Sequence, residues 1–273
     1  MDRIKQDKSI KRKRRIRQFG LFLARLLFIG ALFAMLYIVR RFMPGAGGDT
    51  ALSGLPVSLG GGEEVTLDVP AWSGEPFYTL NGDRPYFDPE KADFRGQEYS
   101  SLDSLGRCGP ARALLDESMM TTEVREDITK VRPSGWHQIR YRGIIDSDPP
   151  FLYHRCHLIA YSLTGQGANE KNLITGTRYF NVQGMLPFEK EIMDYLWDTD
   201  FHVLYRVTPV FEGKDLLCRG VIMEAWSVED RGRSVCFNAF VYNVQPGIIL
   251  DYRDGSSQAE SGRQQEGKLA DID

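Results

Sequence analysis

Residues 19–39 form one uninterrupted apolar segment, and it strongly limits how this chain can fold. The segment has 21 residues and a single charge, Arg25. As an α-helix rising ~1.5 Å per residue it would extend roughly 30 Å, the hydrocarbon thickness of a bilayer. Eight Lys and Arg side chains between Lys5 and Arg17 precede it. By the positive-inside rule, the N-terminus is expected in the cytoplasm and the chain after Val39 outside the cell.

This pattern predicts a single-pass signal anchor at residues 19–39, preceded by a basic cytoplasmic segment at 1–18. A cleaved signal peptide is the alternative. The apolar run exceeds the ~7 to 15 residues usual for a signal peptide, and no clear small-x-small cleavage site follows it. The Pro44-Gly45-Ala46 sequence keeps the cleaved form open as an interpretation.

The rest of the chain is interpreted as one domain between two unstructured segments. Residues 40–64 are rich in Gly, Ser and Pro and are interpreted as a linker. Residues 254–273 are polar and are expected to form a disordered tail. The folded domain is therefore expected at 65–253, and we find no internal repeat.

Within this domain, short apolar runs predict strands around one central helix. Strands are expected at 77–80, 85–87, 136–141, 151–157, 202–210, 216–227 and 234–244. Residues 114–128 are interpreted as an irregular helical region. Apolar spacing across 177–197 predicts a helix, with a break or restart near Pro187. Strands around one helical segment indicate an α+β domain.

The densest group of residues suited to catalysis begins at His154-Arg155-Cys156-His157 and continues with Asn172, Arg178, Asn181 and Glu189. Asn181 and Glu189 are eight positions apart, so on one helix they would lie within about 80° of the same face. A strand ending at His157 would bring that side chain to the same pocket. Each residue alone also has a structural explanation, such as a helix cap or a surface ion pair, and only the joint arrangement favours catalysis.

These residue types suit phosphodiester hydrolysis. The imidazole of His157, with an ordinary pKa of ~6.5, can remove a proton from an attacking water. The Asn181 carbonyl oxygen, together with waters, suits Mg²⁺, with Mn²⁺ as the alternative, and Glu189 would bind a water of that ion. Arg155 and Arg178 are candidate phosphate contacts because a guanidinium matches phosphate oxygens.

The same stretch resembles the DNA/RNA non-specific endonuclease family of the ββα-metal superfamily, in its bacterial surface and secreted branch. The resemblance extends over roughly 77–252, and its longest motif is Asn-Leu-Ile-Thr-Gly-Thr-Arg-Tyr-Phe-Asn at 172–181. Shorter matches occur at 102–107, 133–136, 157–159, 184–189 and 242–247. The resemblance implies an antiparallel sheet around a central metal-binding helix.

By this resemblance, His157 is the general base and Asn181 the metal ligand. Asn172 would be a supporting active-site asparagine, Glu189 would engage the metal's water shell, and Arg155 is the motif arginine. The chain departs from the family's Asp-Arg-Gly-His motif at two positions, where His154 replaces Asp and Cys156 replaces Gly. The role of the missing carboxylate is therefore in question here.

The expected partners are DNA and RNA, cut to 5′-phosphorylated products without sequence preference, and the membrane through residues 19–39. No small-molecule cofactor is expected. After residue 41 the chain carries 22 basic against 35 acidic residues, which opposes long-range attraction of nucleic acid. We therefore expect nucleic acid to bind at a local basic patch around Arg155, Arg178 and Arg206, and this binding should be weak and salt-dependent.

Two other functions remain open at this point. One is a surface DNA receptor that has lost turnover through the changes at His154 and Cys156, and the other is a secreted nuclease toxin. The four cysteines lie in the exported part, where disulfides are permitted. Cys108 and Cys156 are a possible pair, and a buried unreactive thiol at Cys156 is the equal alternative.

Overall fold

The computed structural model describes residues 51–260. The predicted cytoplasmic segment at 1–18 and the predicted anchor at 19–39 lie outside the described residues. Within the described range, no helix is both long and apolar enough to cross a bilayer.

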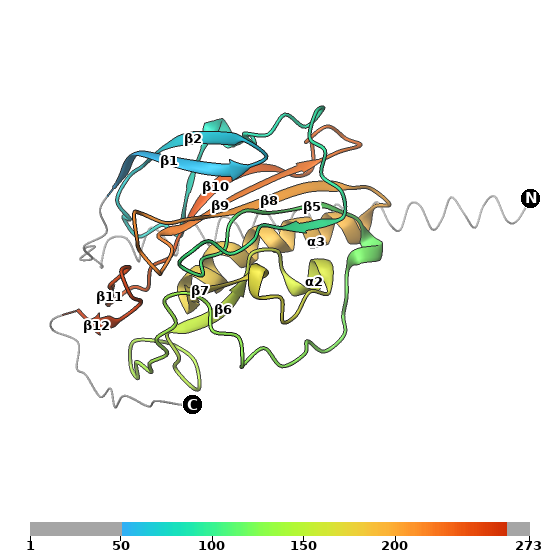
Figure 1. Cartoon of the computed structure of the whole chain (residues 1–273). Helices are drawn as coiled ribbons and strands as arrows, with labels where there is room; N and C mark the ends of the chain where they lie inside the picture. The colour runs from blue at the N-terminus through green and yellow to red at the C-terminus, as the bar shows by residue number, and fades with distance from the viewer. Residues whose placement is uncertain (1–50, 261–273) are drawn as a thin grey trace, which may run out of the picture. The chain divides into compact units, whose positions relative to one another are not determined.

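A six-stranded antiparallel sheet forms the centre of the domain, with strands in the order β3, β10, β9, β8, β5, β4 (Figure 1). The bounds are β3 Phe77–Thr79, β4 Gln97–Tyr99, β5 Ala111–Leu115, β8 Val203–Val210, β9 Gly220–Ser227 and β10 Cys236–Tyr242. All residues of β8 are buried, as expected for a strand covered on both faces. The strands predicted at 202–210, 216–227 and 234–244 are confirmed, each with a later start.

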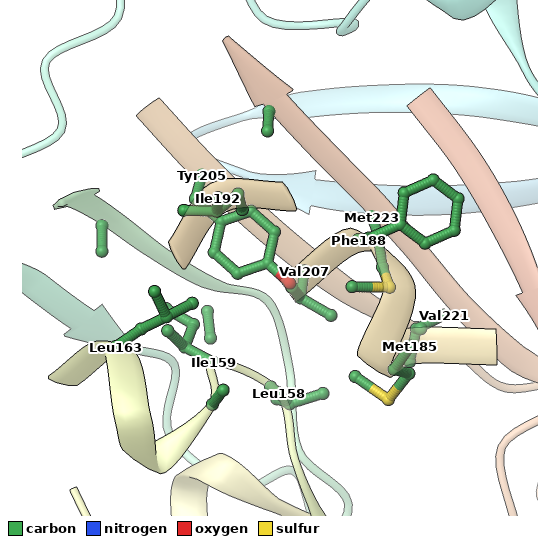
Figure 2. Packing of buried hydrophobic residues seen from close by; sticks show 14 of the residues in the cluster. Leu158, Ile159, Leu163, Met185, Phe188, Ile192, Tyr205, Val207, Val221 and Met223 are labelled. Atoms are coloured by element: carbon green, nitrogen blue, oxygen red, sulfur yellow. The ribbon is translucent and has the colours of Figure 1, made fainter. Parts of the chain in front are cut away.

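Helix α3 (Leu186–Asp198) covers one face of this sheet. Phe188 and Ile192 lie one turn apart on its buried side and pack in the same cluster as Tyr205, Val207 and Met223 of the sheet (Figure 2). A π-helical turn at Phe180–Met185 leads directly into α3, whose first turn contains proline. Proline is tolerated in the first turn of an α-helix, and the predicted break or restart near Pro187 corresponds to the change from π-helix to α-helix at this point.

The opposite face of the sheet is covered by a hairpin of β1 (Leu52–Gly60) and β2 (Glu63–Val69) (Figure 1). Its inward side chains include Leu59 and Leu67, which pack in one cluster with Ile222 and Phe240. The interpretation of residues 40–64 as a linker is therefore wrong for 52–64, and the domain starts before residue 65. The glycines at 60–62 adopt positive φ and make the hairpin turn, which a composition-based interpretation takes for flexibility.

A second hairpin carries the motif residues. Strand β6 (Tyr153–His157) pairs with β7 (Leu173–Thr177), and α2 (Tyr161–Thr164) lies between them in the chain. Gly176 of β7 is required here, because a Cβ at this position would collide with the ring of Phe180 and the Sγ of Cys156. The order β6, β7, α3 confirms the predicted mixed fold with an antiparallel sheet and a central helix.

Four further expectations differ from the structure. Residues 114–128 contain the end of β5 and a 3₁₀ turn at Glu117–Met119 rather than a helical region, and the segment then continues without regular structure. Residues 85–87 form no strand, and 136–141 contain only an isolated bridge between Arg140 and Phe151. Near the C-terminus, β12 (Ser257–Ala259) pairs with β11 (Ile248–Leu250), so the predicted disordered tail is wrong for residues 254–260. The remaining 3₁₀ turns are Asn81–Asp83 and Glu170–Asn172.

Candidate active site

A cavity of about 930 Å³ collects most of the predicted functional side chains. Strand β6 contributes His154, Arg155 and His157, the π-helical turn contributes Asn181, and α3 contributes Glu189. The other wall comes from the irregular chain between Arg125 and Gln138. The structure therefore brings His157, Asn181 and Glu189 to one space, as their spacing predicted, and adds a loop wall that was not predicted.

His157 ends β6 and is buried, with 8% of its surface exposed. Its Nε2 lies 2.9 Å from the carbonyl oxygen of Gly167. A carbonyl oxygen can only accept a hydrogen bond, so Nε2 carries the proton and Nδ1 keeps its lone pair. Burial lowers the pKa of His157 below the ordinary imidazole value. The ring is therefore neutral at neutral pH and can accept a proton at Nδ1.

Asn181 is held by the histidine that replaces the motif aspartate. The Nδ2 of Asn181 lies 3.2 Å from the Nδ1 of His154. Burial, followed by the nearby Arg178, lowers the pKa of His154, so its Nδ1 is available to accept the amide proton. Because the amide nitrogen is occupied in this way, the Oδ1 of Asn181, a residue that lines the cavity, remains available as an oxygen donor.

Glu189 is a buried carboxyl group on the first turn of α3. Burial raises its pKa to about 8. Ionising a carboxyl group in such a place is costly unless a positive charge compensates it. A cation bound in the cavity would provide that charge.

The donors available in the cavity fit a hard divalent cation. Asn181 and Glu189 both offer oxygen, the ligand type that Mg²⁺ prefers while it keeps several waters. No group of three or more His, Cys, Asp or Glu side chains suited to a metal occurs within residues 51–260. A closed structural zinc site of four protein ligands therefore does not match the described residues.

Arg155 is engaged with protein groups on the loop side of the cavity. Its Nε donates to the carbonyl of Val131 at 2.6 Å, and one terminal nitrogen donates to the carbonyl of Thr129 at 2.7 Å. The guanidinium also lies over the ring of Trp136, 4.0 Å from its centroid. Two of its five N–H donors are thus bound by the chain itself.

Three other predicted residues do not line the cavity, namely Asn172, Arg178 and Arg206. Asn172 is fully buried, and its side-chain amide makes two hydrogen bonds with the backbone of Ile159, at 2.9 and 3.0 Å. It therefore supports the segment after His157 and is a positioning residue. Arg178 is absent from the cavity lining, although it lies close enough to His154 to lower the pKa of that ring.

The prediction that Arg206 contributes to a phosphate-binding patch is wrong. Its side chain is buried and forms ion pairs with Glu224 at 2.7 Å and with Glu63 at 2.5 Å. These contacts join β8, β9 and the β1–β2 hairpin. The guanidinium is therefore used inside the scaffold and is closed to a ligand.

Sequence reasoning missed the basic side chains on the loop wall. Arg125, Lys130 and Arg132 all line the cavity and are exposed. The sequence pattern that could have identified them is three basic residues within eight positions, in a chain that is acidic after residue 41. Interleaved Glu126 and Asp127 masked that signal, because they keep the local net charge low.

The cysteine pair proposed from the sequence does not form. All four cysteines, Cys108, Cys156, Cys218 and Cys236, are free thiols. Cys108 instead lies 3.3 Å from the carbonyl oxygen of Leu173, and burial raises its pKa to about 12. Cys156 is a core residue whose pKa is also raised by burial. Its side chain does not line the cavity, so the replacement of the motif glycine leaves the cavity open.

Comparison with known proteins gives a consistent result. A family model described as DNA/RNA non-specific endonuclease matches residues 89–229, a range that contains every predicted site residue. A deoxyribonuclease from Streptococcus dysgalactiae subsp. equisimilis is 32% identical over 115 residues, which cover 40% of this chain and 34% of that protein. The chain thus spans about a third of the length of this curated relative.

Solved structures show the same relationship. NucA from Streptococcus agalactiae with a magnesium ion bound has a TM-score of 0.59 and 25% identity, covering 67% of this chain and 87% of that one. The Sda1 nuclease with a bound zinc ion has a TM-score of 0.58 and 25% identity, covering 68% of this chain and 97% of that one.

Proposed function

Since the chain belongs to the DNA/RNA non-specific endonuclease family, we propose that it cuts DNA, and RNA as well, by hydrolysing internal phosphodiester bonds. The observation that carries this proposal is the arrangement of His157, whose Nε2 is bound by Gly167 and whose Nδ1 is left with a lone pair. The same cavity contains Asn181 and Glu189. A proton acceptor and oxygen donors for a cation thus share one space.

In this reaction, His157 is the general base. A water attacks phosphorus while Nδ1 of His157 accepts its proton, and the bond from phosphorus to the 3′ oxygen breaks. The departing 3′ oxygen takes a proton from a solvent water, so the products are a 5′-phosphate and a 3′-hydroxyl. The imidazolium that forms keeps its Nε2 hydrogen bond to the Gly167 carbonyl, which stabilises the added positive charge.

Asn181 and Glu189 are the residues that would hold the divalent cation, with Mg²⁺ as the first choice and Mn²⁺ as the alternative. When bound, the cation supplies positive charge against the negative charge that grows on the phosphate. His154 contributes by accepting the amide proton of Asn181, which directs the Asn181 oxygen. The magnesium in NucA and the zinc in Sda1 support a divalent cation without choosing the ion.

Substrate recognition is independent of base sequence in this proposal. The loop wall offers Arg125, Lys130 and Arg132, side chains that suit phosphates. Since the chain after residue 41 is acidic, binding should be weak and steeply dependent on salt. Tight binding that stays constant from low to high salt would contradict this part of the proposal.

The N-terminal pattern supports a location at the cell surface. A basic stretch at 1–18 precedes the 21-residue apolar segment at 19–39. This order favours a signal anchor with the nuclease domain outside the cell. Protease added to intact cells should then remove the domain while the N-terminus stays protected. Recovery of the full-length chain in the soluble fraction of lysed cells would exclude the anchor.

The test of activity is plasmid cleavage by the full chain in mild detergent, with Mg²⁺, with Mn²⁺ or with EDTA. Cleavage that requires a divalent cation and leaves 5′-phosphates supports the proposal. Binding of DNA without cleavage under either metal would favour the receptor function instead. The structure gives the receptor function no added support, because His154 engages Asn181 and Cys156 lies in the core.

A further inference from the structure

Residues 125–132, here named the basic segment, form the loop wall of the cavity and contain no helix or strand. Its three cations, Arg125, Lys130 and Arg132, are exposed and line the cavity. No ion pair within residues 51–260 involves any of them. Arg132 does donate to the carbonyl of Thr129, but this acceptor is neutral and leaves the charge of Arg132 uncompensated. The charges of all three are therefore available to a ligand, in contrast to the buried and paired Arg206.

The acidic side chains of the basic segment are used locally. Glu126 accepts a hydrogen bond from the backbone N–H of Ala168 at 2.8 Å, next to the Gly167 carbonyl that binds His157. Asp127 accepts from the backbone and the hydroxyl of Thr129, at 2.8 and 2.9 Å. Both carboxylates thus shape the segment.

Arg155 holds the middle of this segment. Its two donated bonds reach the carbonyls of Val131 and Thr129, and its guanidinium is stacked on Trp136. These carbonyls belong to a stretch without helix or strand partners, so the bonds from β6 replace the hydrogen bonds that regular structure would supply. A guanidinium can bridge two carbonyls and stack at the same time, because its donors lie in one rigid plane.

We infer that Arg125, Lys130 and Arg132 form a binding track for the sugar–phosphate backbone beside the scissile bond, and that Arg155 is a positioning residue that holds this track. This rests on the proposed endonuclease function and deepens it, because it assigns Arg155 to holding the loop whose cations suit phosphates. It also moves the motif arginine from contacting phosphate to holding the loop that does so.

The first experiment measures how DNA affinity depends on salt. The full chain carrying His157→Ala is titrated with a labelled duplex in EDTA at several monovalent salt concentrations, so that no cleavage interferes. Changing Arg125, Lys130 or Arg132 to Gln should each lower the slope of log affinity against log salt by about 1. Arg142→Gln is the matched control, because Arg142 is exposed and lies outside the cavity lining, and its slope should not change.

The role of Arg155 is separated by combining changes. If Arg155 positions the track, Arg155→Ala lowers the slope in the otherwise unchanged chain but has no further effect once all three cations are Gln. If Arg155 itself contacts phosphate, Arg155→Ala lowers the slope by about 1 both when the three cations are present and when all three are Gln. That second result would overturn the inference.

Arg155→Lys gives an independent readout. It keeps the charge but cannot bridge Val131 and Thr129 while stacking on Trp136, so it should behave like Arg155→Ala. Trypsin should then cleave after Arg125 and Lys130 faster than in the unchanged chain, whereas Arg132 is no trypsin site because Pro133 follows it. Full retention of slope and of trypsin resistance by Arg155→Lys would overturn the positioning role.

Trp136→Leu is a milder second variant if Arg155→Ala fails to fold. It removes the ring on which the guanidinium is stacked, and the leucine keeps an apolar side chain against the neighbouring cluster of Leu152 and Tyr153. We expect a smaller loss of slope with the same dependence on the three cations. Cleavage of plasmid DNA by the unchanged chain is scored separately. Absence of cleavage would count against the proposed function, whereas unchanged slopes in the Gln variants would count against the track.

Discussion

The two walls of the cavity are built in different ways. One wall consists of β6, the π-helical turn and α3, and it presents His157, Asn181 and Glu189 as buried or half-buried side chains on regular backbone. The other wall is the irregular chain from Arg125 to Gln138, which presents exposed cations. The first wall has its backbone hydrogen bonds satisfied internally, while the second depends on Arg155 and Glu126 for its shape.

This difference matches two kinds of work. Proton transfer and metal binding need groups held to within about 0.5 Å, which strands and helices achieve better than loops. Attraction of a phosphate backbone tolerates a looser geometry but needs charge that is open to solvent. Changes in the regular wall should therefore affect turnover, and changes in the loop wall should affect binding.

The largest effect is expected for His157→Ala. Without a proton acceptor at this position, turnover should fall by roughly 10² to 10⁴-fold, because that is the usual contribution of general acid–base catalysis. Plasmid cleavage at saturating DNA measures it, and the salt dependence of DNA binding should stay unchanged. Turnover within a few-fold of the unchanged chain would place the base elsewhere.

Asn181→Ala should weaken metal affinity, because it removes an oxygen donor from the cavity. The stabilisation that Mg²⁺ gives to the folded chain depends on the ratio of its concentration to its dissociation constant. Thermal unfolding at increasing Mg²⁺ therefore reports affinity without any assay of activity. We expect the rise in Tm to be lost in this variant. An unchanged rise would show that Asn181 is not a ligand.

A smaller effect is expected for His154, which acts through Asn181. His154→Ala should weaken Mg²⁺ binding by roughly 10 to 100-fold, the range typical for groups that orient metal ligands. His154→Asp restores an acceptor for the Asn181 amide and should recover most of the affinity. The same thermal unfolding series measures both variants. Equal losses in the two would contradict the hydrogen-bond role.

The smallest effect concerns pH. Burial lowers the pKa of His157, so its base form persists below the ordinary imidazole value of ~6.5. The acid limb of kcat/KM against pH should therefore have its midpoint below 6.5. The lowered pKa of His157 also affects stability. As pH falls, the unfolded chain binds a proton at His157 before the folded chain does. The folded state therefore loses stability between pH ~6.5 and the lower pKa of His157 in the folded chain. Because Glu189, with a pKa raised to about 8, must also ionise to hold the cation, the profile is measured at saturating Mg²⁺, which favours the ionised carboxylate. An acid midpoint that stays above ~6.5 under this condition would contradict the buried position of the base.

Much of the fold followed from local patterns. The apolar spacing of α3, the restart near Pro187 and the three long strands β8, β9 and β10 were predicted with small errors in their ends. The β1–β2 hairpin was missed because its three consecutive glycines outweighed the alternation of Val57 with Leu59 and of Val65 with Leu67 and Val69. The long irregular segment after Met119 was missed because its order depends on contacts from other elements.

The residue types that carry the proposed chemistry could be identified from the sequence, because His157, Asn181 and Glu189 lie at positions of regular structure. The use of each arginine was decided only in the folded chain. Arg206 meets Glu63, 143 positions away, and Arg155 meets carbonyls 24 and 26 positions away. A guanidinium binds whichever acceptor the fold brings near, so its partner depends on tertiary contacts that local sequence does not contain.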